Sequence, residues 1–258
     1  MKLTASLVLL LALQLCTPGA QVSKDNPKTP APPEKVSPGA ARTVVCLDPG
    51  HPSEVASGRA MQHGTNETRI AWQVALKLKE ELEARGYEVV LTKSREDELV
   101  RNRDRARVAN RARAALMVRL HCDASVERGF AVYYPDRAGR ARDGTAGPAR
   151  AVVEGSRRAA QAMHDAMAEG LGGALEDNGV RTDNQTKVGR EQGGALTGSI
   201  FSEVPVVTVE MVVLSDARDA EFIKAEEGQR RMAAAIADGV TRFVAPTPAD
   251  SPRNGKKH

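Results

Sequence analysis

Short apolar segments rich in β-branched residues alternate along the chain with longer segments of helical period, and this alternation restricts the possible folds most strongly. Parallel strands joined by helices bury such segments well. We therefore expect an α/β fold, a single domain with a mostly parallel, twisted sheet flanked by helices on both faces. Strands are expected at residues 42–47, 87–93, 115–121, 129–135 and 204–214, and helices at residues 67–85, 96–114, 149–171 and 219–244.

The two ends of the chain fall outside this pattern. Residues 1–20 contain an apolar run after one basic residue and predict a secretory signal peptide, hence export to the periplasm or the exterior. Residues 21–41 hold five prolines and predict a disordered linker, and residues 245–258 predict a disordered tail. Residues 42–244 are the expected folded domain. Because no other apolar run is long enough to span a membrane, no membrane contact is expected after signal cleavage.

The charge balance is mildly basic. The chain has 37 Lys and Arg residues against 33 Asp and Glu residues, a formal net charge of +4. The two signs interleave, as in residues 93–113, which is typical of a solvated helix face. The basic segments lack aromatic residues on which bases would stack, so no nucleic-acid partner is expected. The slight positive charge suits an anionic polymer such as a cell wall.

Two cysteines, Cys46 and Cys122, remain after the predicted cleavage, and each lies on a predicted strand. An exported protein can join two such residues in a disulfide. Small buried thiols are an equally good interpretation. The sequence leaves both open.

Residues with metal-binding or acid–base side chains lie at the ends of predicted strands. His51 follows the first strand, His121 ends the third, and Glu210 lies well along the last. In open α/β sheets, functional sites form beyond the carboxyl ends of the strands. If these strands are parallel neighbours, the three side chains converge at one edge of the sheet.

Two histidines and one carboxylate can hold Zn²⁺ and leave one position open for water. Glu67 opens the first predicted helix, after the loop that begins at His51, and is the candidate third ligand beside His51 and His121. Each of the three also has an ordinary structural interpretation. His51 can be a turn residue, Glu67 an acid favoured by the positive end of a helix, and His121 a core histidine bonded to the backbone.

Glu210 is harder to explain by structure alone. A carboxylate within the apolar segment VPVVTVEMVVL is costly to bury unless something pairs with it. Beside zinc, Glu210 is a candidate general base with a perturbed pKa. His63, four residues before Glu67, can line the rim or replace a ligand, and a solvated loop histidine is the preferred interpretation.

Together these segments resemble the zinc-dependent N-acetylmuramoyl-L-alanine amidases, the family that includes the bacterial cell-separation amidases. The resemblance implies that residues 42–244 are a catalytic domain with zinc ligands His51, Glu67 and His121 and a catalytic Glu210. It also implies peptidoglycan as partner, cleaved between N-acetylmuramic acid and L-alanine. The sequence does not indicate whether a protein activator takes part. The matching segments, in the family's order, are LDPGHP, NETRIAWQVALKLKEELEARGYEVVLTKSRED, RDRARVAN, VRLHCDAS and VPVVTVEMVVLSD.

The chain departs from the family pattern around the implied site. Thr68 follows Glu67, where the family usually has a basic residue. Pro52 replaces the glycine that usually follows the first histidine, and Met-Val-Val follows Glu210 in place of glycine-phenylalanine. The segment between His121 and Glu210 is longer than the minimal family form, which predicts an added loop or lid. Residues 178–198 have little period and are expected to cover the site.

Two other functions remain open. A zinc metallocarboxypeptidase usually has a His-x-x-Glu ligand pair, and His51 and Glu54 have this spacing. A non-catalytic module that binds the cell wall would retain the fold without the chemistry, for which Pro52 and the Met-Val-Val after Glu210 are the sequence support.

Overall fold

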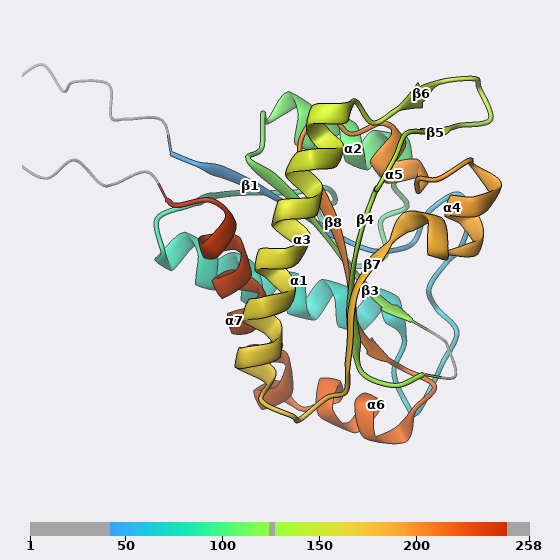
Figure 1. Ribbon diagram of the computed structural model, residues 1–258. Coiled ribbons are helices and arrows are strands. Elements are labelled where there is room, and N and C mark those ends of the chain that lie inside the picture. Colours follow the sequence, from blue (N-terminus) through green and yellow to red (C-terminus); the bar gives the residue numbers. More distant parts are fainter. Residues whose placement is uncertain (1–41, 124–126, 247–258) are drawn as a thin grey trace, which may run out of the picture. The chain divides into compact units, whose positions relative to one another are not determined.

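The predicted strands form the centre of the folded region (Figure 1). The computed structural model describes residues 42–123 and 127–246. The predicted signal peptide (1–20), the linker (21–41) and all but the first two residues of the tail (245–258) therefore lie outside the described residues. The strands are β1 (Val44–Pro49), β2 (Glu88–Leu91), β3 (Leu116–Asp123), β4 (Phe130–Tyr134), β5 (Gly139–Arg140), β6 (Ala146–Gly147), β7 (Asp177–Thr182) and β8 (Val206–Val213). The helices are α1 (Glu67–Ala84), α2 (Asn102–Arg111), α3 (Arg150–Leu171), α4 (Lys187–Glu191), α5 (Thr197–Ile200), α6 (Ala217–Lys224) and α7 (Glu226–Phe243), with a 3-10 turn, η1, at Asp183–Gln185.

The main sheet of the described region has the strand order β2-β1-β3-β8-β4-β7. Strands β2, β1, β3 and β8 run parallel, whereas β4 is antiparallel to β8 and β7 runs parallel to β4. The expected mostly parallel sheet is therefore confirmed, with a reversed edge formed by β4 and β7. Because β1, β3 and β8 are parallel neighbours, their carboxyl ends meet at one edge, as a site of this kind requires.

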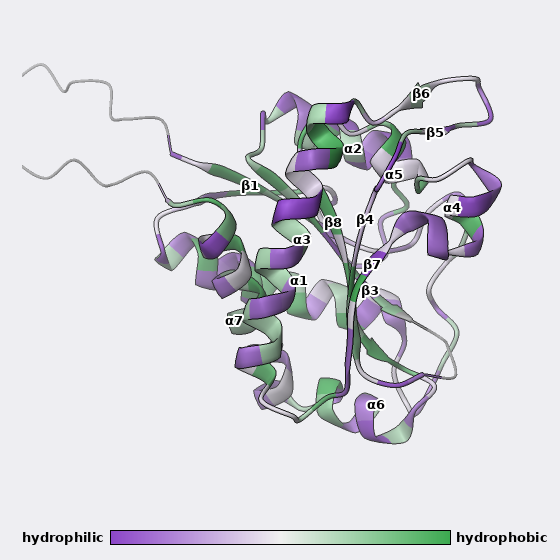
Figure 2. Ribbon diagram, in the orientation of Figure 1, coloured by the Kyte–Doolittle hydropathy of each residue, from purple (hydrophilic) through white to green (hydrophobic). Residues whose placement is uncertain are grey.

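Helices cover both faces of the sheet. Alternate residues of β1 show the division, since Val45 and Leu47 join the main apolar core, whereas Cys46 packs on the opposite face. Helices α1, α3 and α7 cover the first face, and α2 covers part of the second. Figure 2 shows that the central strands are mostly hydrophobic, whereas the helices carry both kinds of residue. The apolar burial on both sides explains why the strands read as nearly continuous apolar runs.

The two cysteines lie on opposite faces of this sheet. Cys122 belongs to the core beneath α1, α3 and α7, and Cys46 packs toward α2. Both are buried. Because the sheet separates them, they do not form a disulfide with each other, which decides in favour of two buried thiols. Burial, with a contribution from the charge of Asp48, raises the pKa of the Cys46 thiol.

The second predicted helix is shorter than expected. The sequence predicted residues 96–114, but α2 begins at Asn102, and Leu99 lies before it with 62% of its surface exposed. The carboxylate of Glu54 accepts hydrogen bonds from the Asn102 backbone N–H (2.9 Å) and side chain (3.3 Å). This acid satisfies a donor at the helix start and fixes the point where the helix begins.

The predicted closing helix is two helices. Asp216 caps α6 by accepting from the backbone N–H groups of Arg218 and Asp219, and Ala225 adopts an extended conformation between α6 and α7. The break lets α7 turn and pack along α3 and α1 (Figure 1). None of the helices in the described residues combines the length and apolar character needed to cross a membrane.

Candidate metal centre

The three predicted zinc ligands meet at the carboxyl edge of the sheet. One ligand atom from each of His51, Glu67 and His121 lies within 4.8 Å of the others. Glu67 is in the middle, with one carboxylate oxygen 2.9 Å from His121 Nδ1 and the other 3.2 Å from His51 Nε2. The two imidazole rings stand edge to face, with centroids 5.1 Å apart. The ordinary structural interpretation, in which these residues serve three unrelated local roles, does not predict this convergence.

The spacing and the donor types fit a zinc ion. Zinc with nitrogen and oxygen ligands at about 2.0–2.2 Å and tetrahedral angles separates neighbouring ligand atoms by roughly 3.3–3.6 Å. The contacts of Glu67 to the two histidines are only slightly shorter than this. The second ring nitrogen of His51 lies 3.1 Å from the Ala56 carbonyl, the kind of outer contact that orients a ligating histidine.

The cluster favours the protonation states that bind a metal. Burial would raise the pKa of the Glu67 carboxyl, but hydrogen bonds from His121 and His51 outweigh it and hold the pKa well below its usual range. Burial lowers the pKa of His121. An ionised carboxylate and a neutral imidazole are the forms that coordinate zinc.

Two glycines make room for the histidines. His51 has a φ of 49°, the left-handed region that a residue with a side chain rarely adopts. A Cβ on Gly58 would lie 2.6 Å from the His51 Cβ, and a Cβ on Gly50 would lie 2.6 Å from the His121 ring. The Asp-Pro-Gly-His sequence therefore does two things: it turns the chain after β1 and clears the space for the histidine of β3.

The structure gives a local role to the two residues that depart from the family pattern beside the ligands. Thr68 is buried, and its hydroxyl donates to the Ser57 carbonyl at 2.8 Å while its backbone N–H donates to Gly58. These bonds tie the loop after His51 to the start of α1. Pro52 is also buried, and its carbonyl accepts a hydrogen bond from Arg105 at 2.9 Å.

Beneath the loop that carries His51 lies a buried ion network centred on Asp48. The Asp48 carboxylate accepts from Arg105 Nη1 at 2.6 Å, from Arg119 Nε at 2.9 Å and from the Thr92 hydroxyl at 2.6 Å. Asp48 is fully buried, and Arg105 and Arg119 are 1% and 4% exposed. Burial alone would raise the pKa of Asp48, but the two guanidinium groups and Thr92 hold it well below its usual range.

The same network holds the backbone of the ligand loop. Besides Asp48, Arg105 donates to the carbonyls of Pro49 (2.8 Å) and Pro52 (2.9 Å), on either side of His51. The Lys93 ammonium donates to the His51 carbonyl itself. Burial and the neighbouring charge of Arg105 lower the pKa of Lys93 to about 8. His51 is therefore fixed by contacts of the chain on both sides of it and at its own carbonyl.

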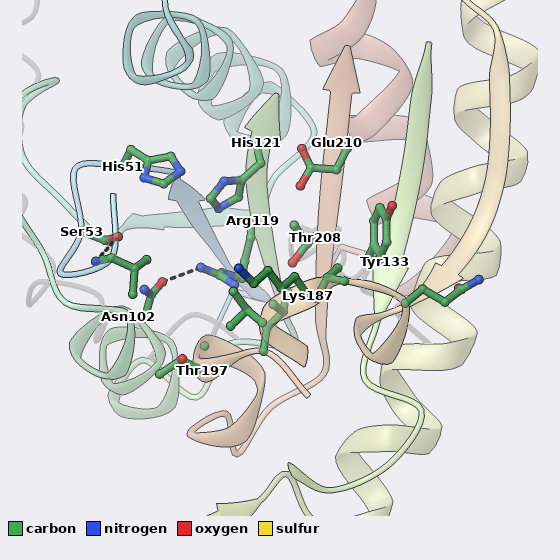
Figure 3. A pocket seen from close by; sticks show the side chains of 16 residues that line it. His51, Ser53, Asn102, Arg119, His121, Tyr133, Lys187, Thr197, Thr208 and Glu210 are labelled. Carbon is green, nitrogen blue, oxygen red and sulfur yellow. Dashed lines mark hydrogen bonds between the residues drawn. The ribbon is translucent and has the colours of Figure 1, made fainter. Parts of the chain in front are cut away.

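Glu210 lies next to the cluster on the adjacent strand. It is the register partner of His121 in the pairing of β3 with β8, so its side chain is on the same face of the sheet. Figure 3 shows the carboxylate of Glu210 beside the His121 ring, over the same hollow. A carboxylate in this position can exchange protons with a group bound at the metal cluster.

A cavity of about 410 Å³ opens in front of these residues (Figure 3). His51, His121 and Glu210 line its metal end, and Arg119 and Thr208 line it further along the same strands. The opposite wall comes from the predicted covering segment, which contributes residues 185–188 and 196–198. That segment comprises most of β7, followed by η1, α4 and the start of α5. The prediction that this segment covers the site is confirmed for residues 185–188 and 196–198, but the segment contains short helices where a long loop or short strands were expected.

Two other candidate ligands lie outside the cluster. Glu54 bonds to Asn102 at the start of α2, so the structure does not join it with His51 in a His-x-x-Glu metal site. His63 is exposed, and its Nε2 lies 3.1 Å from the Ser215 carbonyl. Its preferred interpretation as a loop histidine agrees with this position.

Four residues that line or support the cavity were not expected from the sequence: Asp48, Asn102, Arg105 and Arg119. A signal for two of them was present. Asp48 and Arg119, like Glu210, are charged residues within apolar strand segments, and a buried charge requires a partner. Arg105 lies among many exposed arginines of the same stretch and carries no such signal.

Comparison with known proteins identifies relatives of the chain. Residues 45–242 match the family model described as N-acetylmuramoyl-L-alanine amidase. The chain is 28% identical over 228 residues to the N-acetylmuramoyl-L-alanine amidase Rv3717 of Mycobacterium tuberculosis, a match that covers 80% of this chain and 88% of that protein. It is 27% identical over 223 residues to the amidase AmiC of Neisseria meningitidis, covering 79% of this chain and 53% of that protein. The chain thus spans about half the length of the Neisseria relative.

Solved structures support the fold. The catalytic domain of CwlV, an N-acetylmuramoyl-L-alanine amidase from Bacillus (Paenibacillus) polymyxa var. colistinus, has a TM-score of 0.60 at 26% identity, covering 78% of this chain and 97% of that one. The amidase AmiC2 of Nostoc punctiforme has a TM-score of 0.62 at 21% identity, covering 78% of this chain and 96% of that one, which is a likeness of fold.

The buried Asp48 network predicts a pH-dependent loss of stability on replacement of the acid. In the metal-free protein, Asp48→Asn should lower the free energy of unfolding at pH 7 by about 3–5 kcal/mol, because two buried arginines lose a charged partner. The pKa of Asp48 is lower in the folded protein than its unfolded value of about 3.9. The ionised carboxylate therefore makes its full contribution to stability above this unfolded pKa, and the contribution declines as the pH falls below it. The difference in the free energy of unfolding between the unaltered chain and Asp48→Asn should therefore be smaller by about 1 kcal/mol at pH 3 than at pH 7.

Urea denaturation followed by circular dichroism at pH 3 and pH 7 measures both differences. The matched control is Asp104→Asn, since Asp104 is 44% exposed and pairs with Arg107 on the surface of α2. Its effect should stay within about 0.5 kcal/mol at either pH. An equal difference for Asp48→Asn at pH 3 and pH 7 would contradict the proposed charge state.

Proposed function

The chain belongs to the family of N-acetylmuramoyl-L-alanine amidases, and from this membership and the site we propose that it hydrolyses peptidoglycan. The bond cut is the amide between the lactyl group of N-acetylmuramic acid and the L-alanine of the stem peptide. Zn²⁺ is the proposed metal, with His51, Glu67 and His121 as its ligands and Glu210 as the general base.

One observation carries this proposal. Three side chains of the two types suited to catalytic zinc, imidazole and carboxylate, converge at the sheet edge, and a carboxylate of the neighbouring strand faces the same cavity. Three protein ligands leave a coordination position for water, which is the arrangement of a hydrolytic rather than a structural zinc site. The cavity is not fully enclosed, so a polymer can present one bond to it.

The residues of the site have different roles in the proposed hydrolysis. Zinc, when bound, polarises the scissile carbonyl and lowers the pKa of a bound water to about 7. Glu67 and the two histidines supply the ligand atoms, and the Asp48 network holds the His51 loop in place. A carboxylate oxygen of Glu210 accepts the proton of the attacking water and delivers a proton to the nitrogen of the leaving L-alanine.

The location of the proposed substrate requires that the protein be exported. Peptidoglycan lies outside the cytoplasmic membrane, so this function requires export, and the apolar N-terminal segment of residues 1–20 provides the signal for it. We accordingly propose that the protein acts in the periplasm or outside the cell. The family membership and the slight positive charge of +4 support peptidoglycan as the partner.

The metal assignment predicts different outcomes for two similar histidines. His51→Ala removes a ligand and should lower zinc affinity by more than about 100-fold, since loss of an outer contact to a ligand alone costs 10–100-fold. His63→Ala is the matched control, because His63 also has a left-handed backbone (φ 45°) in a loop but lies outside the cluster.

Zinc content after dialysis, measured by plasma mass spectrometry, compares the two variants with the unaltered chain. His63→Ala should retain about one zinc per chain, as three ligands suffice for one ion. Unchanged zinc content in His51→Ala would contradict the ligand assignment.

The catalytic assignment predicts that binding and chemistry separate at Glu210. With purified sacculi and zinc, the unaltered chain should release soluble stem peptides with a new L-alanine amino terminus, and a chelator should abolish release. Glu210→Gln should keep its zinc but lower the rate by roughly 10²–10⁴-fold, the usual contribution of a general base.

Mass spectrometry of the released ends distinguishes the alternatives. Release of single carboxy-terminal residues would indicate a carboxypeptidase, and binding to sacculi without hydrolysis would indicate a wall-binding module. Activity of Glu210→Gln within a few-fold of the unaltered chain would rule out the role given to Glu210.

A further inference from the structure

Arg119 is a buried cation in the wall of the substrate cavity. It lies on β3 two residues before His121, on the same face of the sheet, and is 4% exposed. Its Nε donates to Asp48 at 2.9 Å and its Nη2 donates to the Asn102 side-chain oxygen at 2.8 Å (Figure 3). Its Nη1 makes no hydrogen bond to any residue that the structure describes. The two contacts hold the guanidinium plane rigid and leave one nitrogen for another acceptor.

The wall above this nitrogen lacks a side chain. Gly198, at the start of α5, lies against the guanidinium, and a Cβ at this position would lie 2.8 Å from Arg119 Cζ and 2.9 Å from Nη1. Gly198 does not have a left-handed backbone, so its conformation does not require glycine. The absence of a side chain at residue 198 therefore lets α5 pack against the guanidinium without a methyl group beside Nη1.

The charges that line the cavity favour an anion at this end. Arg119 and Lys187 are the basic side chains of the lining, and the acid of the lining, Glu210, lies at the metal end. Asp48 is behind the lining and is shared between two arginines. Asp183, the other buried acid nearby, lies outside the lining and accepts from the Leu196 backbone N–H at 3.0 Å.

The spacing relates Arg119 to a position on the substrate. Residues two apart on a strand have Cα atoms separated by about 6.6–6.8 Å, which is the length of about two extended peptide residues. A peptide whose amide lies at the metal cluster can therefore reach Arg119 within about its first two residues. On the muramyl side of that amide the lactyl carboxyl is already consumed in the amide, so a free carboxylate must come from the peptide side.

We propose that Arg119 binds a free α-carboxylate on the second residue of the stem peptide and makes the enzyme selective for it. This inference rests on the proposed amidase function and adds the determinant of peptide selectivity. A guanidinium held by two other acceptors loses little conformational entropy when its third nitrogen binds the carboxylate. The resulting hydrogen bond is charge-assisted. A neutral carboxamide in the same place loses the charge and presents an N–H₂ group that the guanidinium cannot accept.

Two soluble substrates test the selectivity of the zinc-loaded protein. They are N-acetylmuramoyl tripeptides that differ only at the second residue, which is D-glutamate with a free α-carboxylate or D-isoglutamine with an α-carboxamide. The unaltered chain should have a kcat/KM higher by about 10–100-fold on the carboxylate, the range expected for one hydrogen bond to a charged group. The difference should appear mainly in KM.

Two variants remove the contact in different ways. Arg119→Lys keeps a positive charge opposite Asp48 but lacks a second nitrogen that can donate into the cavity. The ratio of kcat/KM on the carboxylate to kcat/KM on the carboxamide should therefore fall to about 1–3. Gly198→Ala keeps both Arg119 and Asp48 in the chain and places a methyl group against the guanidinium beside Nη1, so the ratio of the two kcat/KM values should fall likewise. Arg105→Lys is the matched control, because Arg105 shares Asp48 but does not line the cavity. It should lower the rates on both tripeptides by the same factor and keep the ratio.

The outcomes are distinguishable. If the zinc-loaded chain cleaves neither tripeptide and no sacculi, the proposed amidase function fails. If it cleaves both tripeptides equally well, or if Arg119→Lys and Gly198→Ala retain the preference, the amidase function stands and the role of Arg119 is wrong.

Discussion

The buried carboxylate of Asp48, shared by Arg105 and Arg119, is the interaction on which the geometry of the site depends. It joins β1, β3 and α2 at the edge of the sheet where the ligands meet. Arg105 extends the network to the carbonyls on both sides of His51. Without these contacts, the loop after β1 would lose the hydrogen bonds to the carbonyls of Pro49 and Pro52, on either side of His51.

Such a buried ion network adds little net stability to the sheet. Desolvating three charged groups costs about as much as their mutual attraction returns, so an apolar cluster would stabilise the fold at least as well. Its advantage is directional, since a guanidinium group has donors at fixed angles, which can hold carbonyls and a carboxylate in one arrangement. In this chain those donors fix the loop that carries His51 on one side and, through Arg119, reach the cavity on the other. One set of buried charges thus connects the proposed metal ligand to the proposed carboxylate contact.

Much of the architecture follows from the sequence pattern, because the strands and long helices bury continuous apolar faces. The ligand trio of His51, Glu67 and His121 could be predicted because parallel neighbours bring strand ends together. The start of α2 could not, since it is set by Glu54, a residue 48 positions earlier in the chain. The reversed direction of β4 and β7 also depends on tertiary pairing that no local pattern specifies. The pairing of Asp48 and Arg119 could have been predicted, because a charged residue inside an apolar strand requires a buried partner.

The most direct test of this account is the position of zinc itself. Anomalous scattering at the zinc absorption edge, measured from crystals of residues 42–246 grown with zinc, should show one strong peak. The account predicts that the peak lies about 2.0–2.2 Å from one atom each of His51, Glu67 and His121, with Glu210 beside it and not bound to it. A peak at Glu54 or His63, or none at the three predicted ligands, would contradict the account.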